Sequence, residues 1–107
     1  MNGKAVYACH LLALDTADKE ITTIEGLLKE EKLHPLQEAF VEKDGLQCGY
    51  CTPGQVMAAY VLLKENPRPS KEQVMKGMSG NLCRCGAYPK IIDSVLAAAA
   101  KAPQFKK

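Results

Sequence analysis

Two cysteine motifs, Cys48–Pro53 (CGYCTP) and Cys83–Pro89 (CRCGAYP), are the most informative stretches of this sequence. Each places two cysteines in a loop directly before a predicted helix that begins with proline. Proline is favoured at that position because its missing N–H would have had no partner there. Four of the five cysteines of the chain belong to this informal repeat. Such clustering is typical of metal binding.

The position of both motifs at helix N-termini suits a negatively charged metal group. Iron–sulfur clusters bound by thiolates are anionic, and a helix N-terminus offers unpaired N–H groups and about half a positive charge. Two pairs of cysteines can also bind zinc, although the Cys-x-Cys spacing of the second motif is tighter than a usual zinc knuckle. Spacing alone therefore leaves open an iron–sulfur cluster, a zinc ion and buried or redox-active thiols.

Helical periodicity begins near His34 and continues to the end of the chain. Apolar residues recur at i, i+3 and i+4 spacing, Thr52 is expected to cap the second helix, and Ser70 and Gln73 form a capping box for the third. Four helices with short connections predict a compact all-α bundle. The predicted helices cover 35–42, 53–65, a short stretch from Ser70 to Gly77–Gly80, and 89–101 with Pro103 ending the last.

Residues 1–26 differ from the rest of the sequence. Lys4–Ala8 and Ile21–Ile24 have β-branched and aromatic character, with the polar turn Asp15–Asp18 between them. Two short strands form no stable sheet alone, so we expect a short residual β segment whose partner strands lie elsewhere. The predicted organisation is a remnant over 1–26 followed by a helical domain over 27–107.

Longer stretches around the cysteines resemble a known family. Leu46–Gly54 (LQCGYCTPG) and Ser79–Pro89 (SGNLCRCGAYP) are similar to the second 2Fe–2S domain of the xanthine dehydrogenase family, the molybdenum hydroxylases. The match is nearest to the iron–sulfur small subunits of bacterial aldehyde and carbon monoxide dehydrogenases. Ile21–Gly26 and Leu33–Gln37 resemble the same subunit, so the likeness covers nearly the whole chain.

The resemblance implies one 2Fe–2S cluster and an electron-transfer role. In this family the cluster lies beside the pterin of a molybdenum cofactor that a large subunit holds, and it passes electrons to a second cluster and usually to FAD on a third subunit. Gln47 and Cys85 match the residues nearest the pterin. The implied cluster ligands are Cys48, Cys51, Cys83 and Cys85.

One departure from the family pattern concerns the N-terminal part. Family subunits begin with a plant-type ferredoxin domain of roughly 75 residues that holds a second cluster, and that domain is missing from this sequence. Cys9 matches the fourth ligand of the second cluster, and alone it is expected to be a free thiol. Residues 1–26 then correspond to the end of the ferredoxin domain, whose remaining strands lie elsewhere. The chain is then a fragment, the product of a late start codon or one half of a split subunit, and the sequence leaves these alternatives open.

Composition excludes several other function classes. The net charge is +2, and the densest basic patch is the Lys106–Lys107 pair, so nothing indicates nucleic-acid binding. No apolar stretch is long enough for a bilayer, and no signal peptide is visible, which predicts a cytoplasmic protein unless a partner carries it to the periplasm. No nucleophile–base pair or carboxylate dyad is present. Chemistry on a substrate is therefore expected from a partner, and the alternative function is a structural zinc-binding module.

Overall fold

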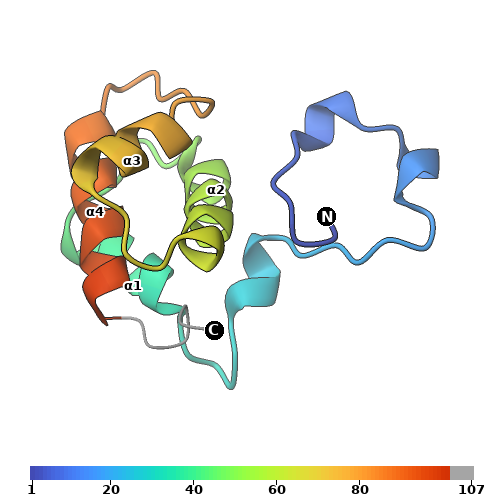
Figure 1. Cartoon of the computed structure of the whole chain (residues 1–107), viewed down its shortest axis with the longest axis horizontal. Coiled ribbons are helices and arrows are strands. Elements are labelled where there is room, and N and C mark those ends of the chain that lie inside the picture. Colours follow the sequence, from blue (N-terminus) through green and yellow to red (C-terminus); the bar gives the residue numbers. More distant parts are fainter. Residues whose placement is uncertain (102–107) are drawn as a thin grey trace.

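The computed structural model describes residues 1–101 and contains four α-helices packed as a bundle (Figure 1). The predicted all-α four-helix fold is confirmed, and each helix begins within a residue of its predicted start. The elements are η1 (Ala8–His10), η2 (Ala13–Thr16), η3 (Ile24–Leu27), α1 (Pro35–Glu42), α2 (Thr52–Glu65), α3 (Lys71–Gly77) and α4 (Tyr88–Lys101), where η marks a 3-10 helix.

Two of the helices begin with capping boxes. The predicted box at α3 is confirmed: the Ser70 hydroxyl accepts the N–H of Gln73 at 3.2 Å, and the Gln73 side chain accepts the N–H of Ser70 at 2.8 Å. At α1 the capping residue is His34, whose Nδ1 accepts the N–H of Leu36 at 3.1 Å. The predicted Thr52 cap is wrong. Thr52 is the first residue of α2, and Cys51 before it is the N-cap, with no side-chain hydrogen bond that caps the helix.

The core forms where the bundle helices meet. α1 and α4 share the most extensive packing. Phe40 on α1, Leu63 on α2 and Ile91 on α4 are among the largest fully buried side chains. Each large apolar side chain removed from water contributes about 1.5–3 kcal/mol. This core therefore holds in place the N-termini of α2 and α4, where both cysteine motifs lie.

The N-terminal segment, residues 1–26, extends away from the bundle on the side of α2 (Figure 1). The expected strands at Lys4–Ala8 and Ile21–Ile24 are wrong, because residues 1–101 contain no strand and this segment forms 3-10 turns instead. Strand formation needs a neighbouring strand to satisfy its backbone groups. Here the backbone of Asn2 bonds that of Glu20 at 2.8 Å, which closes the segment into a loop.

Leu27 marks the start of the bundle, since it is the first buried residue of the chain. An isolated antiparallel bridge between Lys29 and Lys32 then turns the chain towards α1. Within residues 1–101, no helix is both long and apolar enough to cross a membrane. The predicted helix end at Pro103, the basic pair Lys106–Lys107 and the final residues of the predicted 27–107 domain lie outside the described residues.

Candidate metal centre

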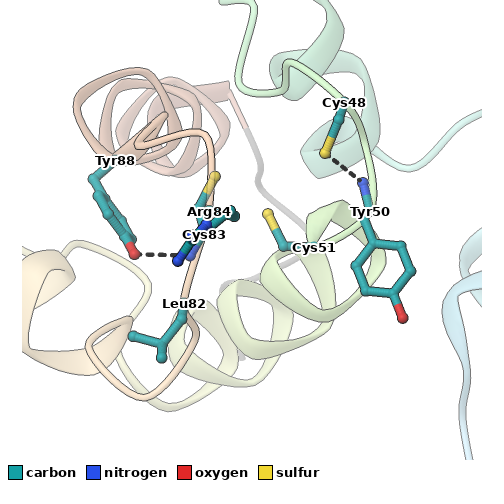
Figure 2. Close-up of a pocket in the computed structure, with 7 residues that line it drawn as sticks. All are labelled: Cys48, Tyr50, Cys51, Leu82, Cys83, Arg84 and Tyr88. Carbon is teal, nitrogen blue, oxygen red and sulfur yellow. Dashed lines mark hydrogen bonds between the residues drawn. The ribbon is translucent and has the colours of Figure 1, made fainter.

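The two cysteine motifs face one pocket of about 460 Å³ between the N-termini of α2 and α4. Figure 2 shows Cys48 and Cys51 projecting from the loop before α2, opposite the loop that carries Cys83 and Arg84. The lining consists of Cys48, Tyr50, Cys51, Leu82, Cys83, Arg84 and Tyr88.

Each thiol of the first motif has its pKa influenced by a thiol of the second motif. The Cys85 side chain acts on the pKa of Cys48, and the Cys83 side chain acts on the pKa of Cys51. We call Cys48 and Cys85 the outer pair because both are exposed, and Cys51 and Cys83 the inner pair because Cys83 is only 7% exposed. Three of the four predicted ligands, Cys48, Cys51 and Cys83, line the pocket, and Cys85 follows in the same loop as Cys83. Within residues 1–101, no three potential ligands converge on a single ion.

Backbone N–H groups point at the sulfur atoms. The N–H of Tyr50 donates to Cys48 Sγ at 3.5 Å. The N–H groups of Ala87, Cys85 and Gly86 each lower the pKa of the Cys83 thiol. Gly86 has a φ of +73°, a conformation that residues with a side chain rarely adopt. A cradle of backbone donors of this kind stabilises negative charge on sulfur.

The same contacts set the pKa of each thiol. The Tyr50 N–H and then the Cys85 thiol lower the pKa of Cys48, and the Ala87 N–H is the largest cause that lowers the pKa of Cys83. Burial, followed by the Cys83 side chain, raises the pKa of Cys51. The Cys48 N–H alone would lower the pKa of Cys85, but the Cys48 side chain and burial raise it. Each pair therefore contains one sulfur that favours the thiolate.

Three side chains hold the second cysteine loop in place. The Tyr88 hydroxyl accepts the N–H of Cys83 at 2.7 Å (Figure 2). Gln55, from α2, donates through Nε2 to the carbonyl of Asn81 at 3.1 Å. Tyr7, from the N-terminal segment, donates to the carbonyl of Gly80 at 2.7 Å. Sequence patterns did not indicate Gln55 as a site residue. Its only signal was a polar side chain on the inward face of an otherwise apolar helix, one turn after Cys51.

The remaining singled-out residues lie around the pocket or away from it. Gln47 is exposed beside Cys48, and Arg84 is exposed at the pocket. Tyr50 lines the pocket, although its side chain is 94% exposed. Cys9 is an exposed free thiol in η1 and belongs to neither pair.

Comparison with known proteins identifies the family. A family model described as the 2Fe–2S binding domain matches residues 23–96, which include both cysteine motifs. The chain belongs to this family. Its relatives include iron–sulfur subunits, so the resemblance to the xanthine dehydrogenase family is confirmed.

Two curated relatives and one solved structure illustrate the similarity. The aldehyde oxidoreductase iron-sulfur-binding subunit of Escherichia coli is 41% identical, and 89% of this chain aligns with 48% of that protein. A probable xanthine dehydrogenase subunit of Bacillus subtilis is 48% identical, and 88% of this chain aligns with 54% of it. Quinoline 2-oxidoreductase from Pseudomonas putida 86 superimposes with a TM-score of 0.90 at 43% identity, over 96% of this chain and 65% of that one. The chain thus spans about half the length of these curated relatives.

Proposed function

We propose that the chain relays electrons through one 2Fe–2S cluster held by Cys48, Cys51, Cys83 and Cys85. The observation that carries the proposal is that residues of both cysteine motifs line one pocket at the N-termini of α2 and α4. A zinc ion needs its four ligands to converge on one centre, whereas a 2Fe–2S cluster distributes four cysteines over two irons. We assign the outer pair to one iron and the inner pair to the other.

The chemistry around the pocket fits an anionic group. When bound, a 2Fe–2S cluster accepts and releases single electrons. The N-termini of α2 and α4 and the backbone donors of Tyr50 and Ala87 offset the added negative charge. Within residues 1–101, Thr52 Oγ1 is the one buried side-chain oxygen or nitrogen without a partner, next to Cys51. A bound acceptor at this end of α2 would satisfy it.

The surface around the outer pair is proposed to meet the large molybdopterin-binding subunit. Tyr50 and Leu82 are 94% and 79% exposed there, and aromatic and arginine side chains such as Tyr50 and Arg84 are enriched at protein interfaces. Gln47 is assigned to the partner's pterin. Electrons would enter near Cys85 and leave towards a second cluster and then FAD on a further subunit.

The N-terminal segment, residues 1–26, is proposed to be the end of a ferredoxin-like domain, and residues 27–107 to be the helical cluster-binding domain. Leu12 and Leu14 are 68% and 86% exposed in the segment, which leaves apolar surface uncovered. Cys9, whose position matches a ligand of the second cluster in the family, is proposed to be a free thiol in this chain. Affinity purification from the native host should co-elute molybdenum-containing and flavin-containing chains. A stable monomer without any partner would contradict this assignment.

Anaerobic reconstitution of the full chain with iron and sulfide tests the cluster itself. The expected product is brown, with about two irons and two sulfides per chain and a rhombic EPR signal after reduction. Serine at any of the four proposed ligands should abolish or severely destabilise the cluster. Cys9→Ser is the matched control and should keep the visible spectrum. A colourless protein with one zinc per chain, or bleaching by Cys9→Ser, would overturn the proposal.

A further inference from the structure

The backbone of Cys83 is held by two hydrogen bonds from within its own loop. Its N–H donates to the Tyr88 hydroxyl at 2.7 Å (Figure 2), and its carbonyl accepts the N–H of Gly86 at 3.1 Å. Cys83 is only 7% exposed, and a buried backbone group without a partner costs free energy. Both polar backbone groups of Cys83 are thus satisfied inside the loop, which leaves the thiol as its group available for a ligand bond.

The helical bundle fixes the position of Tyr88. Tyr88 is the first residue of α4, and the carbonyl of Ala87, directly before it, accepts the N–H of Ile91 at 3.0 Å. Ala87 and Ile91 are buried, at 3% and 2% exposure. The tyrosine ring therefore projects from a helix start that the core holds in place. Its hydroxyl is a fixed acceptor against which the loop can be closed.

Gly86 provides the other half of this closure. Its φ is +73°, and a Cβ built there would meet nothing within 4 Å. The position thus favours glycine for its backbone conformation and not for lack of space. The contacts of Gly86 and Tyr88 close the loop on both sides of the Cys83 peptide.

We propose that Tyr88 is a positioning residue whose hydroxyl fixes the direction in which Cys83 presents its thiol to the metal group. This inference rests on the proposed function. Without the hydroxyl, the buried Cys83 N–H loses its acceptor, which favours loop conformations that pair this N–H elsewhere. Such conformations turn the thiol away from its ligand position. Residues that orient a metal ligand in this way strongly affect how tightly the metal is held.

The test compares the reconstituted full chain as wild type, Tyr88→Phe and Ser94→Ala. Tyr88→Phe removes only the hydroxyl and keeps the ring at the start of α4. Ser94→Ala is the matched control, because it also removes a hydrogen-bonded hydroxyl from α4, where Ser94 donates to the Lys90 carbonyl at 2.7 Å. Tyr88→Phe should lose its cluster to an excess of iron chelator about tenfold faster than the wild type. Its visible circular dichroism should also change, because this signal depends on the arrangement of the ligands around the irons. Ser94→Ala should match the wild type in both measurements.

The possible results separate this inference from the proposed function. A wild-type chain that takes up no 2Fe–2S cluster would overturn both. A Tyr88→Phe chain with the cluster-loss rate and visible spectrum of the wild type would overturn only the role of Tyr88. The same holds if Tyr88→Phe loses its helical far-ultraviolet signal, since Tyr88 would then support the bundle and not the loop. A folded Tyr88→Phe chain that takes up no cluster would be the extreme form of the expected result.

A second variant tests the loop closure without altering Tyr88. Gly86→Ala strains the backbone at the N–H that bonds the Cys83 carbonyl, and the open space around Gly86 prevents a clash. Its cluster should also be lost faster than that of the wild type. An unchanged rate in Gly86→Ala would show that closure of the loop does not hold Cys83, which would overturn the inference.

Discussion

The N-terminal segment and the helical bundle differ in whether local sequence preference leads to packed structure. Within residues 1–101, every buried residue lies at Leu27 or later, and none lies in the segment. The segment has β-forming residues but no neighbouring strands, and it forms isolated 3-10 turns. The bundle has amphipathic helices whose apolar faces cover one another. Local preference thus produced stable structure only where a packing partner was available.

Truncating one apolar side chain in each region should sharpen this contrast most. Phe40 in the bundle is 1% exposed, whereas Leu14 in the N-terminal segment is 86% exposed. Phe40→Ala should lower the free energy of unfolding by about 3–5 kcal/mol, because it leaves a cavity. Leu14→Ala should change it by less than about 0.5 kcal/mol. Urea unfolding followed by circular dichroism, at equal cluster loading, measures both. A comparable loss of unfolding free energy in both variants would contradict the contrast between the two regions.

A smaller effect is expected from the start of α3. Ser70→Ala removes the hydroxyl that accepts the Gln73 N–H and should reduce stability by about 1 kcal/mol. Thr16→Ala is the counterpart in the N-terminal segment, where the Thr16 hydroxyl bonds only the nearby Ala13 carbonyl. That change should leave the unfolding midpoint in place. An equal shift in the two variants would show that the segment also contributes to cooperative unfolding.

The cap of α1 should make the stability of the bundle depend on pH. Burial, followed by the charges of Lys29 and Lys64, lowers the pKa of His34. The folded state then binds fewer protons than the unfolded state between the lowered pKa and about 6.5. Stability from this group is complete above about pH 6.5 and is lost as pH falls through the lowered pKa. His34→Asn keeps a capping side chain and should remove this part of the pH dependence. A dependence of the urea midpoint on pH that is the same in His34→Asn and in the wild type would contradict this role of His34.

The smallest effect is expected where the N-terminal segment contacts the bundle. Tyr7→Phe removes the hydrogen bond to the Gly80 carbonyl and should cost less than about 1 kcal/mol overall. Hydrogen exchange should nevertheless accelerate in the segment and in the loop before Cys83. Tyr50→Phe is the matched control, since the Tyr50 side chain is 94% exposed. Unchanged exchange in Tyr7→Phe would mean that the contact does not hold the segment in place.

Much of the bundle could be predicted from sequence because its signals are local. Proline at the first turn, the Ser70–Gln73 box and the i, i+3, i+4 periodicity fix helix starts and apolar faces without knowledge of the rest of the chain. The His34 cap was not predicted, since histidine is not among the usual capping residues. Thr52 was predicted as a cap from residue type alone, but α2 already begins at Thr52 and its N-cap is Cys51.

The residues of the candidate site were proposed from the sequence, but their geometry was not. Cysteine spacing and the family resemblance indicated the four ligands, because thiols in such motifs serve few other purposes. The pairing of Cys48 with Cys85 and of Cys51 with Cys83 depends on how α2 and α4 pack, which spacing does not encode. Gln55 was missed for the same reason, since its partner Asn81 is distant in sequence.

The packing of α1 against α4 has a consequence for synthesis on the ribosome. The first helix of the bundle finds its main partner in the last, and the Glu42–Lys101 ion pair at 2.7 Å joins the same two elements. Chains elongate at about 5–20 residues per second, so roughly 50 further residues must follow Cys51 before α4 is complete, a delay of about 2.5–10 seconds. Throughout that interval Cys51 lacks the core that partly buries it, and until Cys83 and Cys85 are synthesised both Cys48 and Cys51 lack their partner thiols. These two sulfurs are thus open to premature oxidation during synthesis, and slowly translated codons between the two motifs would lengthen that interval.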